Sequence, residues 1–318
     1  MMRKYFLLSF LLAALLTAAA QKAPVQAVQR KQKADTVPSL KSTRLHEVSI
    51  SSKKKLPNVQ KVSVYAPDDL QIDGSMAEWD NHFKAFNKAT GIYYTISNND
   101  GYIYLAVQAK NRRIINKLMG GGLSFTISSS CMDADTNNVT VLFPLMPLPL
   151  CREILHTAGK SITESYHGLD EPTYKSNKKS IPQANNDLTE NMRYIKVAGV
   201  KTITDFVDPN TIITYYKQLP LLYHYFKLIA VNNQSGIKAT TRFDKKGAYN
   251  YEMAIPIKYL GDNIDKYQKF GYNITLHGRP EDRRPGSITT VINNKIGYNT
   301  DVDLPTGFWG EYVLAKSW

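Results

Sequence analysis

Cysteine is nearly absent from this chain of 318 residues, which contains only Cys131 and Cys151. Two cysteines cannot form a disulfide-rich scaffold, and neither has a second metal ligand at the usual spacing. In an oxidising compartment the two can pair, closing a loop of about 20 residues and stabilising the fold by roughly 3 kcal/mol. Two independent buried thiols are an equal alternative.

Recognisable catalytic motifs are also missing. The sequence contains no H-E-x-x-H, G-x-S-x-G, P-loop or G-x-G-x-x-G pattern. Residues 120–122 are three glycines, but they precede a predicted strand and therefore lack the helix N-terminus that holds phosphate. We interpret them as a flexible entry to that strand. No catalytic residue is predicted, and the chain is not expected to be an enzyme.

Clustered metal ligands are scarce as well. The six histidines are scattered without metal-ligand spacing, so a haem pair from His224 or His277 with a methionine is only a minor alternative. Glycoside hydrolysis needs two carboxylates across a cleft, whereas the closely spaced acids here share single loops. Such loops can hold calcium through oxygen ligands, but solvated turns are the favoured interpretation, so no metal or cofactor is assigned. The loop residues are Asp133, Asp135, Asn137 and Asn138, and separately Asp301 and Asp303.

Long hydrophobic runs are absent after the first twenty residues. Arg3 and Lys4 precede the apolar residues 6–16, and three alanines at 18–20 follow. This pattern is typical of a secretory signal peptide over residues 1–20, with a short membrane anchor as the alternative. We therefore expect a secreted, periplasmic or cell-envelope protein without a transmembrane segment after cleavage.

Acidic residues are too few to balance the net charge of +13. Residues 21–61 hold ten lysines and arginines against two acids, whereas residues 62–318 carry a net charge of only +3. The excess therefore belongs mainly to a segment without hydrophobic periodicity, which we interpret as a flexible basic tether. A nucleic-acid partner is not expected, because it requires a basic stripe on the folded domain.

Short runs of alternating apolar and polar residues follow the tether. Period two predicts strands with one buried face, and several close together predict an antiparallel β-sandwich, immunoglobulin-like or jelly-roll-like, over residues 62–318. The runs include residues 102–107, 123–127, 139–143, 249–255 and 270–276.

A hairpin and an insertion complete the predicted organisation. Residues 99–101 (N-D-G) separate two apolar runs, and Asp-Gly supplies the positive φ angles of a tight turn. Residues 146–190 form a helical insertion, with helical spacing from Cys151 and a polar loop over residues 173–186.

Four short motifs follow one another along the chain. They are residues 72–79 (I-D-G-S-M-A-E-W), 102–107 (Y-I-Y-L-A-V), 251–256 (Y-E-M-A-I-P) and 308–310 (F-W-G). In this order they resemble the opening pattern, the second strand, the late Y-E-x-x-I-P motif and the last strand of the family 9 carbohydrate-binding modules and related DOMON-like sandwiches, as in secreted proteins of unassigned role from Bacteroidetes-type bacteria. The resemblance implies a β-sandwich that binds carbohydrate.

The motif residues are expected to have structural roles. Trp79 should plug the sandwich, Glu78 should accept bonds from a neighbouring turn, and Pro256 should end a strand. Lys110, Arg112 and Arg113 stand where the family often has an acidic residue, so a metal site is not expected there. The complete scaffold set is Asp73, Gly74, Glu78, Trp79, Glu252, Pro256 and Trp309.

Tyrosines on the predicted hairpin are the candidate ligand-binding surface, because exposed rings stack on sugar rings. Cross-strand packing without a ligand is the alternative. We therefore predict a secreted or periplasmic non-catalytic module, with carbohydrate as the first expected partner. The alternative is an envelope structural or protein-interaction domain that uses the insertion as its contact. The candidate rings are Tyr93, Tyr94, Tyr102 and Tyr104, with a second cluster at Tyr223 and Tyr225.

Overall fold

The computed structural model describes the chain in several stretches. The described residues are 55–129, 138–160, 180–212, 227–278, 291–292, 295–296, 302 and 304–317, except residues 68, 81 and 266. All of them belong to one compact unit, Lys53–Trp318. The expected signal peptide and most of the expected tether lie outside the described residues. No helix among the described residues is long and apolar enough to cross a membrane.

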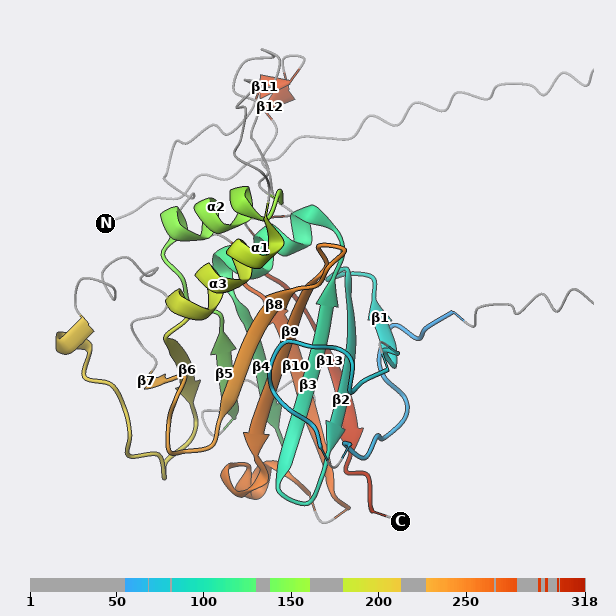
Figure 1. Ribbon diagram of the computed structural model, residues 1–318. Helices are drawn as coiled ribbons and strands as arrows, with labels where there is room; N and C mark the ends of the chain where they lie inside the picture. Colours follow the sequence, from blue (N-terminus) through green and yellow to red (C-terminus); the bar gives the residue numbers. More distant parts are fainter. Residues whose placement is uncertain are drawn as a thin grey trace, which may run out of the picture. The chain divides into compact units, whose positions relative to one another are not determined.

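Two antiparallel sheets face each other, which confirms the predicted mainly-β sandwich (Figure 1). The five-stranded sheet has the order β1 (Ala85–Asn87), β2 (Ile92–Asn98), β3 (Tyr102–Ala109), β9 (Tyr249–Pro256) and β8 (Lys238–Phe243). The six-stranded sheet has the order β13 (Thr306–Val313), β10 (Lys269–Leu276), β4 (Leu123–Ser128), β5 (Val139–Phe143), β6 (Tyr194–Ala198) and β7 (Lys227–Ala230). β11 (Val291–Ile292) and β12 (Lys295–Ile296) form a separate pair.

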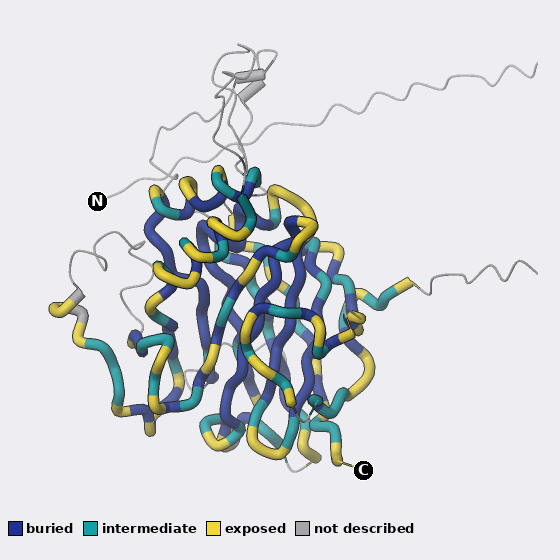
Figure 2. Tube along the Cα trace, viewed as in Figure 1, coloured by how far each residue is buried: buried dark blue, intermediate teal, exposed yellow. Residues whose placement is uncertain are grey.

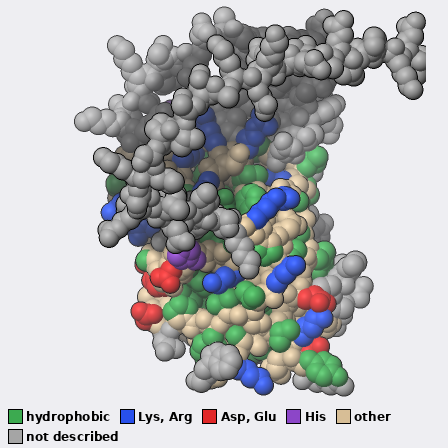
Figure 3. All heavy atoms as spheres, turned by 90° about the vertical axis from the view of Figure 1, so that its right-hand side faces the viewer, with side chains coloured by type: hydrophobic (Ala, Val, Ile, Leu, Met, Phe, Trp, Pro, Cys, Tyr) green, Lys and Arg blue, Asp and Glu red, His purple; other side chains and the backbone are tan. Residues whose placement is uncertain are grey.

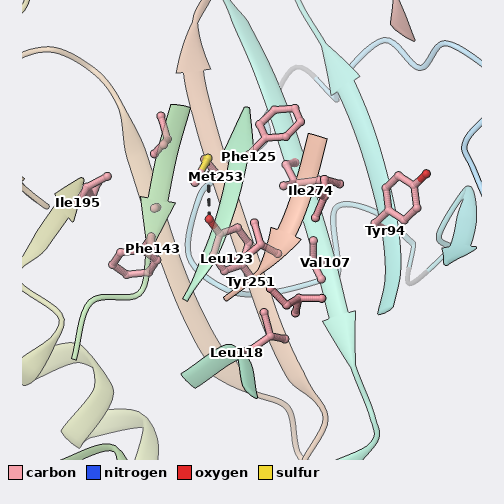
Figure 4. Close-up of a cluster of buried hydrophobic side chains, with 14 of the residues drawn as sticks. Tyr94, Val107, Leu118, Leu123, Phe125, Phe143, Ile195, Tyr251, Met253 and Ile274 are labelled. Carbon is pink, nitrogen blue, oxygen red and sulfur yellow. Dashed lines mark hydrogen bonds between the residues drawn. The ribbon is translucent and has the colours of Figure 1, made fainter. Parts of the chain in front are cut away.

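The inner faces of the two sheets supply the core. Alternate side chains of β3 and β4, such as Val107 and Phe125, are fully buried between the sheets (Figure 4). In Figure 2, buried residues follow the strands of both sheets. Tyr94 of β2 and Tyr272 of β10 join the layers through their hydroxyl groups, 3.0 Å apart. Period-two alternation therefore determines which residues form this core.

Three helices gather at one end of the sandwich (Figure 1). α2 (Leu148–Thr157) and α3 (Ile181–Asn191) lie between β5 and β6, which confirms the helical insertion. The prediction of a loop over residues 173–186 is wrong from Ile181 onward, because α3 begins there. Ser180 caps this helix, and Pro182 occupies its first turn. The described residues also include short 3₁₀ turns at Pro209–Ile212, Ile257–Tyr259 and Gly261–Asn263.

The glycine run has a different role from the predicted strand entry. α1 (Arg112–Gly121) buries Ile115, Leu118 and Met119 at helical spacing, and Gly122 caps its C-terminus at φ 77°. A Cβ on Gly121 would lie 1.6 Å from the carbonyl oxygen of Gly278. The glycines therefore end a helix where another backbone passes against it.

The predicted hairpin between β2 and β3 is confirmed, but its turn is built differently. Gly101 does not adopt a positive φ angle. Instead the Oδ1 atom of Asn99 accepts hydrogen bonds from the backbone N–H groups of Gly101 and Tyr102, at 3.0 and 2.9 Å. The asparagine side chain therefore organises this turn.

The folded region begins earlier than the expected boundary at residue 62. The side chain of Gln60 is 4% exposed; it accepts from the backbone N–H of Ile96 and donates to the backbone carbonyl of the same residue, both at 2.8 Å. These bonds satisfy the backbone N–H and carbonyl groups of Ile96 in β2, which lies beyond the end of the short edge strand β1. We call residues 56–83 the strap; it is the blue segment that crosses in front of β2 and β3 in Figure 1.

Candidate functional site

One row of side chains crosses all five strands on the outer face of the five-stranded sheet. Cross-strand register aligns Phe86 of β1 with Tyr93, Tyr93 with Gln108, Gln108 with Asn250, and Asn250 with Arg242 of β8. The row therefore runs from two aromatic rings through two amides to a guanidinium group. We call these five residues the outer row.

The strap covers the neighbouring rows and reaches the edge of the outer row, where Arg242 is exposed while Gln108 and Asn250 are buried. Its side chains Met76 and Trp79 are buried against Tyr104, Ala106 and Ala254. Trp79 thus fills the outer face of one sheet rather than the interior between the sheets. The strap therefore acts as a wall beside the outer row.

Glu252 fastens the strap to the sheet. Its Oε2 atom accepts from the backbone N–H groups of Asp73 and Gly74, at 3.1 and 2.7 Å. Its Oε1 atom accepts from Nε1 of Trp79 at 2.7 Å. Glu252 is 0% exposed; burial raises the pKa of its carboxyl group to about 7, while the three donors oppose that increase. The motifs at residues 72–79 and 251–256 therefore form one joint.

Gly74 is the tightest point of this joint. Its φ angle is 83°, and an added Cβ would lie 2.6 Å from Cβ of Arg242. Asn250 donates from Nδ2 to the carbonyl oxygen of Gly74 at 3.1 Å. A glycine is therefore required both by the conformation and by the close approach of the strap to β8.

Substitution of this glycine tests the joint. Gly74→Ala is expected to lower the free energy of unfolding by about 2 to 3 kcal/mol, because left-handed strain and overpacking add. Gly261→Ala is the matched control: Gly261 also has a positive φ angle, 46°, but nothing lies within 4 Å of an added Cβ. Denaturant titration of both variants should give a loss of only about 1 kcal/mol for the control. Equal losses would contradict a close approach at Gly74.

Two clefts open along the outer row. The larger, of about 1370 Å³, has Gln108 and Asn250 at its floor, and its walls come from the strap at Gly74, from α3 and from the turn between β8 and β9. The smaller, of about 510 Å³, contains Phe86 and Tyr93 and is bounded by α1. Lys110 borders both clefts, so they adjoin each other.

Hydrogen bonds fix the amides of the larger cleft. Nε2 of Gln108 donates to Oδ1 of Asn250 at 3.0 Å, and both residues are about 5% exposed or less. Asn185 of α3 is held to Phe243, accepting from its N–H and donating to its carbonyl oxygen. These bonds hold the amides in fixed orientations and leave only part of their hydrogen-bonding capacity for a ligand.

Among the described tyrosines of the predicted binding surface, Tyr93 alone lines one of the two clefts, the smaller one. The ring of Tyr93 is half-buried. Its centroid lies 4.6 Å from the ring centroid of Phe86 and 4.5 Å from Nζ of Lys110. The prediction that Tyr94 belongs to the binding surface is wrong, because its ring is fully buried between the sheets. Tyr104 faces outward but is 7% exposed under the strap, and Tyr102 packs half-buried beside it. Tyr223 and Tyr225 lie outside the described residues.

Glu252 takes the role that the sequence assigned to Glu78. Glu252 receives the backbone bonds of the turn, whereas Oε2 of Glu78 is buried without a hydrogen-bond partner among the described residues. Pro256 does end β9 as expected. Trp309 lies half-buried on β13, opposite Asn273 and away from both clefts.

The two cysteines and the residues of the alternative calcium and haem sites lie mostly outside the described residues. Cys151 is buried in α2, but Cys131 lies outside the described residues. The acidic loop at residues 133–137, Asp301, Asp303 and His224 lie outside them too. His277 accepts or donates a 2.9 Å bond with Ser124, and burial lowers its pKa to about 4. In the described part of the chain, no three His, Cys, Asp or Glu side chains converge as metal ligands.

Sequence reasoning missed most of the outer row. Gln108, Asn250 and Arg242 occur in ordinary strand positions, and nothing in their spacing links three segments up to 142 positions apart. The one available signal was Gln108, a polar residue that continues the alternation of β3 beyond Tyr104. Only cross-strand register shows that these residues align.

The larger cleft is lined mainly by amides and cations. Asp244 supplies the only carboxylate among the described residues that line the larger cleft, and its Oδ1 atom already accepts from the N–H groups of Lys246 and Ala248. Amides and cations surround it. Comparison of the chain with protein-family models, with curated proteins and with solved structures finds no match.

Proposed function

We propose that this chain is an exported, non-catalytic carbohydrate-binding module of the cell envelope, and that the outer row is its binding site. The observation that carries the proposal is the alignment of two half-buried rings, two buried amides and an exposed guanidinium across five strands, along which two clefts open. Sugars present apolar C–H faces and hydroxyl groups, which match aromatic rings and amides respectively. The rigid sheet beneath them preorganises the contacts.

The resemblance to family 9 carbohydrate-binding modules supports the same function. Its opening motif and its late motif, far apart in the sequence, meet at Glu252 through Gly74 and Trp79. A joint of this kind gives both motifs a structural reason to occur together. It also gives the strap a fixed position beside the outer row.

A binding role without catalysis is supported by the composition of the cleft. Hydrolysis of a glycosidic bond uses two carboxylates about 5 to 10 Å apart. Asp244 is the single described carboxylate of the larger cleft, and it caps its own turn. The chain is therefore proposed to hold a glycan and not to cleave it.

The alternative of a protein-interaction domain receives less support. An apolar patch on the insertion would favour it. Most exposed side chains of the described insertion are polar or charged, such as Arg152, Glu153, Gln183 and Asn186, and the exposed apolar ones are Pro149 and Pro182. A carbohydrate partner is therefore the better proposal.

Removal of the aromatic ring of the outer row tests the site. Tyr93→Ala is expected to weaken binding of the retained polysaccharide at least fivefold, because the ring contributes roughly 1 kcal/mol of contact to a sugar face. Affinity gel electrophoresis of the purified chain against a panel of neutral and acidic polysaccharides measures this. Tyr267→Ala is the matched control, since Tyr267 is 71% exposed and lies outside the outer row.

Two results would contradict the proposal. Absence of retention by every polysaccharide would exclude carbohydrate as the partner. Equal binding by both tyrosine variants, with unchanged circular dichroism, would exclude the outer row as the site.

A further inference from the structure

The larger cleft has a pronounced excess of positive charge. Five cationic side chains line it, against the single carboxylate of Asp244. This excess is local, because residues 62–318 carry a net charge of only +3. The five cations are Lys110, Lys160, Arg242, Lys245 and Lys246.

The fold gathers these cations from separate elements. Lys110 follows β3, Lys160 follows α2, Arg242 belongs to β8, and Lys245 and Lys246 occupy the turn between β8 and β9. Figure 3 views the molecule from the side of β1; lysine and arginine side chains are spread over this face, and the acidic side chains that it shows lie in its lower half. The basic surface is therefore a product of tertiary structure, unlike the basic segment before residue 62.

Among the described residues, no ion pair neutralises these cations. In the described part of the chain, the ion pair of Lys269 with Glu311 is 2.7 Å long, but no such pair involves any of the five cations of the cleft. Arg242, Lys245 and Lys246 are exposed at its rim. Their combined field therefore remains available to attract a negatively charged ligand.

The floor of the cleft indicates what kind of anion fits. Gln108, Asn250 and Asn185 present amides, which bind hydroxyl groups. Phe243 is the sole aromatic residue among the described lining residues, and it is 1% exposed. Single-stranded nucleic acids need a series of exposed rings on which successive bases stack, and this cleft does not provide one. A chain rich in hydroxyl groups and carrying acidic groups fits better.

We infer that the larger cleft binds an acidic polysaccharide, whose carboxylate or sulfate groups contact the five cations while its hydroxyl groups contact the amide floor. This inference rests on the proposed carbohydrate-binding function and names the ligand class. The rim cations attract and orient the acidic groups. The fixed amides favour anionic ligands that also carry sugar hydroxyl groups.

Charge removal at the rim tests the inference. Lys245→Gln/Lys246→Gln is expected to weaken binding to polygalacturonate or to dextran sulfate about tenfold at 0.1 M salt, because two uncompensated cations are lost. The control is Lys201→Gln/Lys316→Gln, which removes the same charge from exposed positions outside the cleft. It should bind like the unaltered chain. Raising the salt concentration should weaken the unaltered chain more than the rim variant.

The choice of probes separates the possible failures. Preference for polygalacturonate identifies carboxylate as the acidic group, and preference for dextran sulfate identifies sulfate; both support the inference. Tighter binding of neutral xylan or dextran, unaffected by the rim variant, overturns the inference but leaves the proposed function intact. Equal binding of single-stranded DNA, with the same loss in the rim variant, overturns the assignment to a glycan. Retention of no probe overturns both.

Discussion

Glu252→Ala is expected to lower the free energy of unfolding by about 4 kcal/mol at pH 5 and by about 2 kcal/mol at pH 8. The substitution leaves the N–H groups of Asp73, Gly74 and Trp79 without their acceptor in a buried place, at about 1 to 3 kcal/mol for each poorly solvated donor. Relaxation of the strap toward water recovers part of that cost. Urea titration at the two pH values measures the difference.

The pH dependence follows from the raised pKa of the carboxyl group. Burial moves the pKa of Glu252 from an ordinary value of 4.5 to about 7. Between these values the folded state binds more protons than the unfolded state, so the unaltered protein loses stability as pH rises. Each pKa unit corresponds to about 1.4 kcal/mol, which gives a change of about 2 kcal/mol between pH 5 and pH 8. The alanine variant lacks this titration.

A surface carboxylate supplies the comparison. Glu311→Ala removes the exposed ion pair with Lys269 and should cost less than about 1 kcal/mol at both pH values. If Glu252→Ala were no more destabilising than Glu311→Ala, the strap would not depend on this carboxylate. Limited proteolysis of the Glu252 variant should also cut within residues 56–83 before it cuts the strands.

Gly121→Ala is expected to lower the free energy of unfolding by about 3 kcal/mol or more. An added Cβ would lie 1.6 Å from the carbonyl oxygen of Gly278, and 2.5 Å from its carbonyl carbon and its backbone nitrogen. Backbone atoms cannot rotate away as a side chain can, so α1 must separate from the segment after β10. Thermal or denaturant unfolding measures the loss.

The hairpin glycine serves as the control for this substitution. Gly101 is exposed, and an added Cβ there would meet only Oδ1 of Asn99 at an ordinary 3.7 Å. Gly101→Ala should change stability by less than about 1 kcal/mol. A similar loss in both variants would mean that the contact between α1 and Gly278 is not close in solution.

The sandwich itself could be predicted because a buried face imposes period-two alternation on each strand. The runs at β3, β4, β5, β9 and β10 alternate clearly, and all five are strands. α1 was not predicted, because its helical spacing is short and ends in glycines that resemble a loop. The first half of α3 resembles a loop in the sequence, because polar residues dominate its exposed side and only Ala184 and Leu188 are buried.

The candidate site was far less accessible to sequence reasoning. Tyr93 could be selected as a ring on a predicted strand, but burial of Tyr94 and Tyr104 depends on what covers each face of the sheet. The strap covers one part of the outer face and leaves another open, and that division follows from long-range bonds to Glu252. Local patterns contain no information about such pairings across the fold.

The position of Glu252 late in the chain determines when the strap can close. Trp79 and Glu252 are 173 positions apart. During synthesis from the N-terminus, the apolar side chains of the strap have no surface to cover until β9 (Tyr249–Pro256) has been made. β3 likewise lacks its partner on that side until then. A nascent chain therefore cannot complete the five-stranded sheet or cover its outer face before β9 has been made.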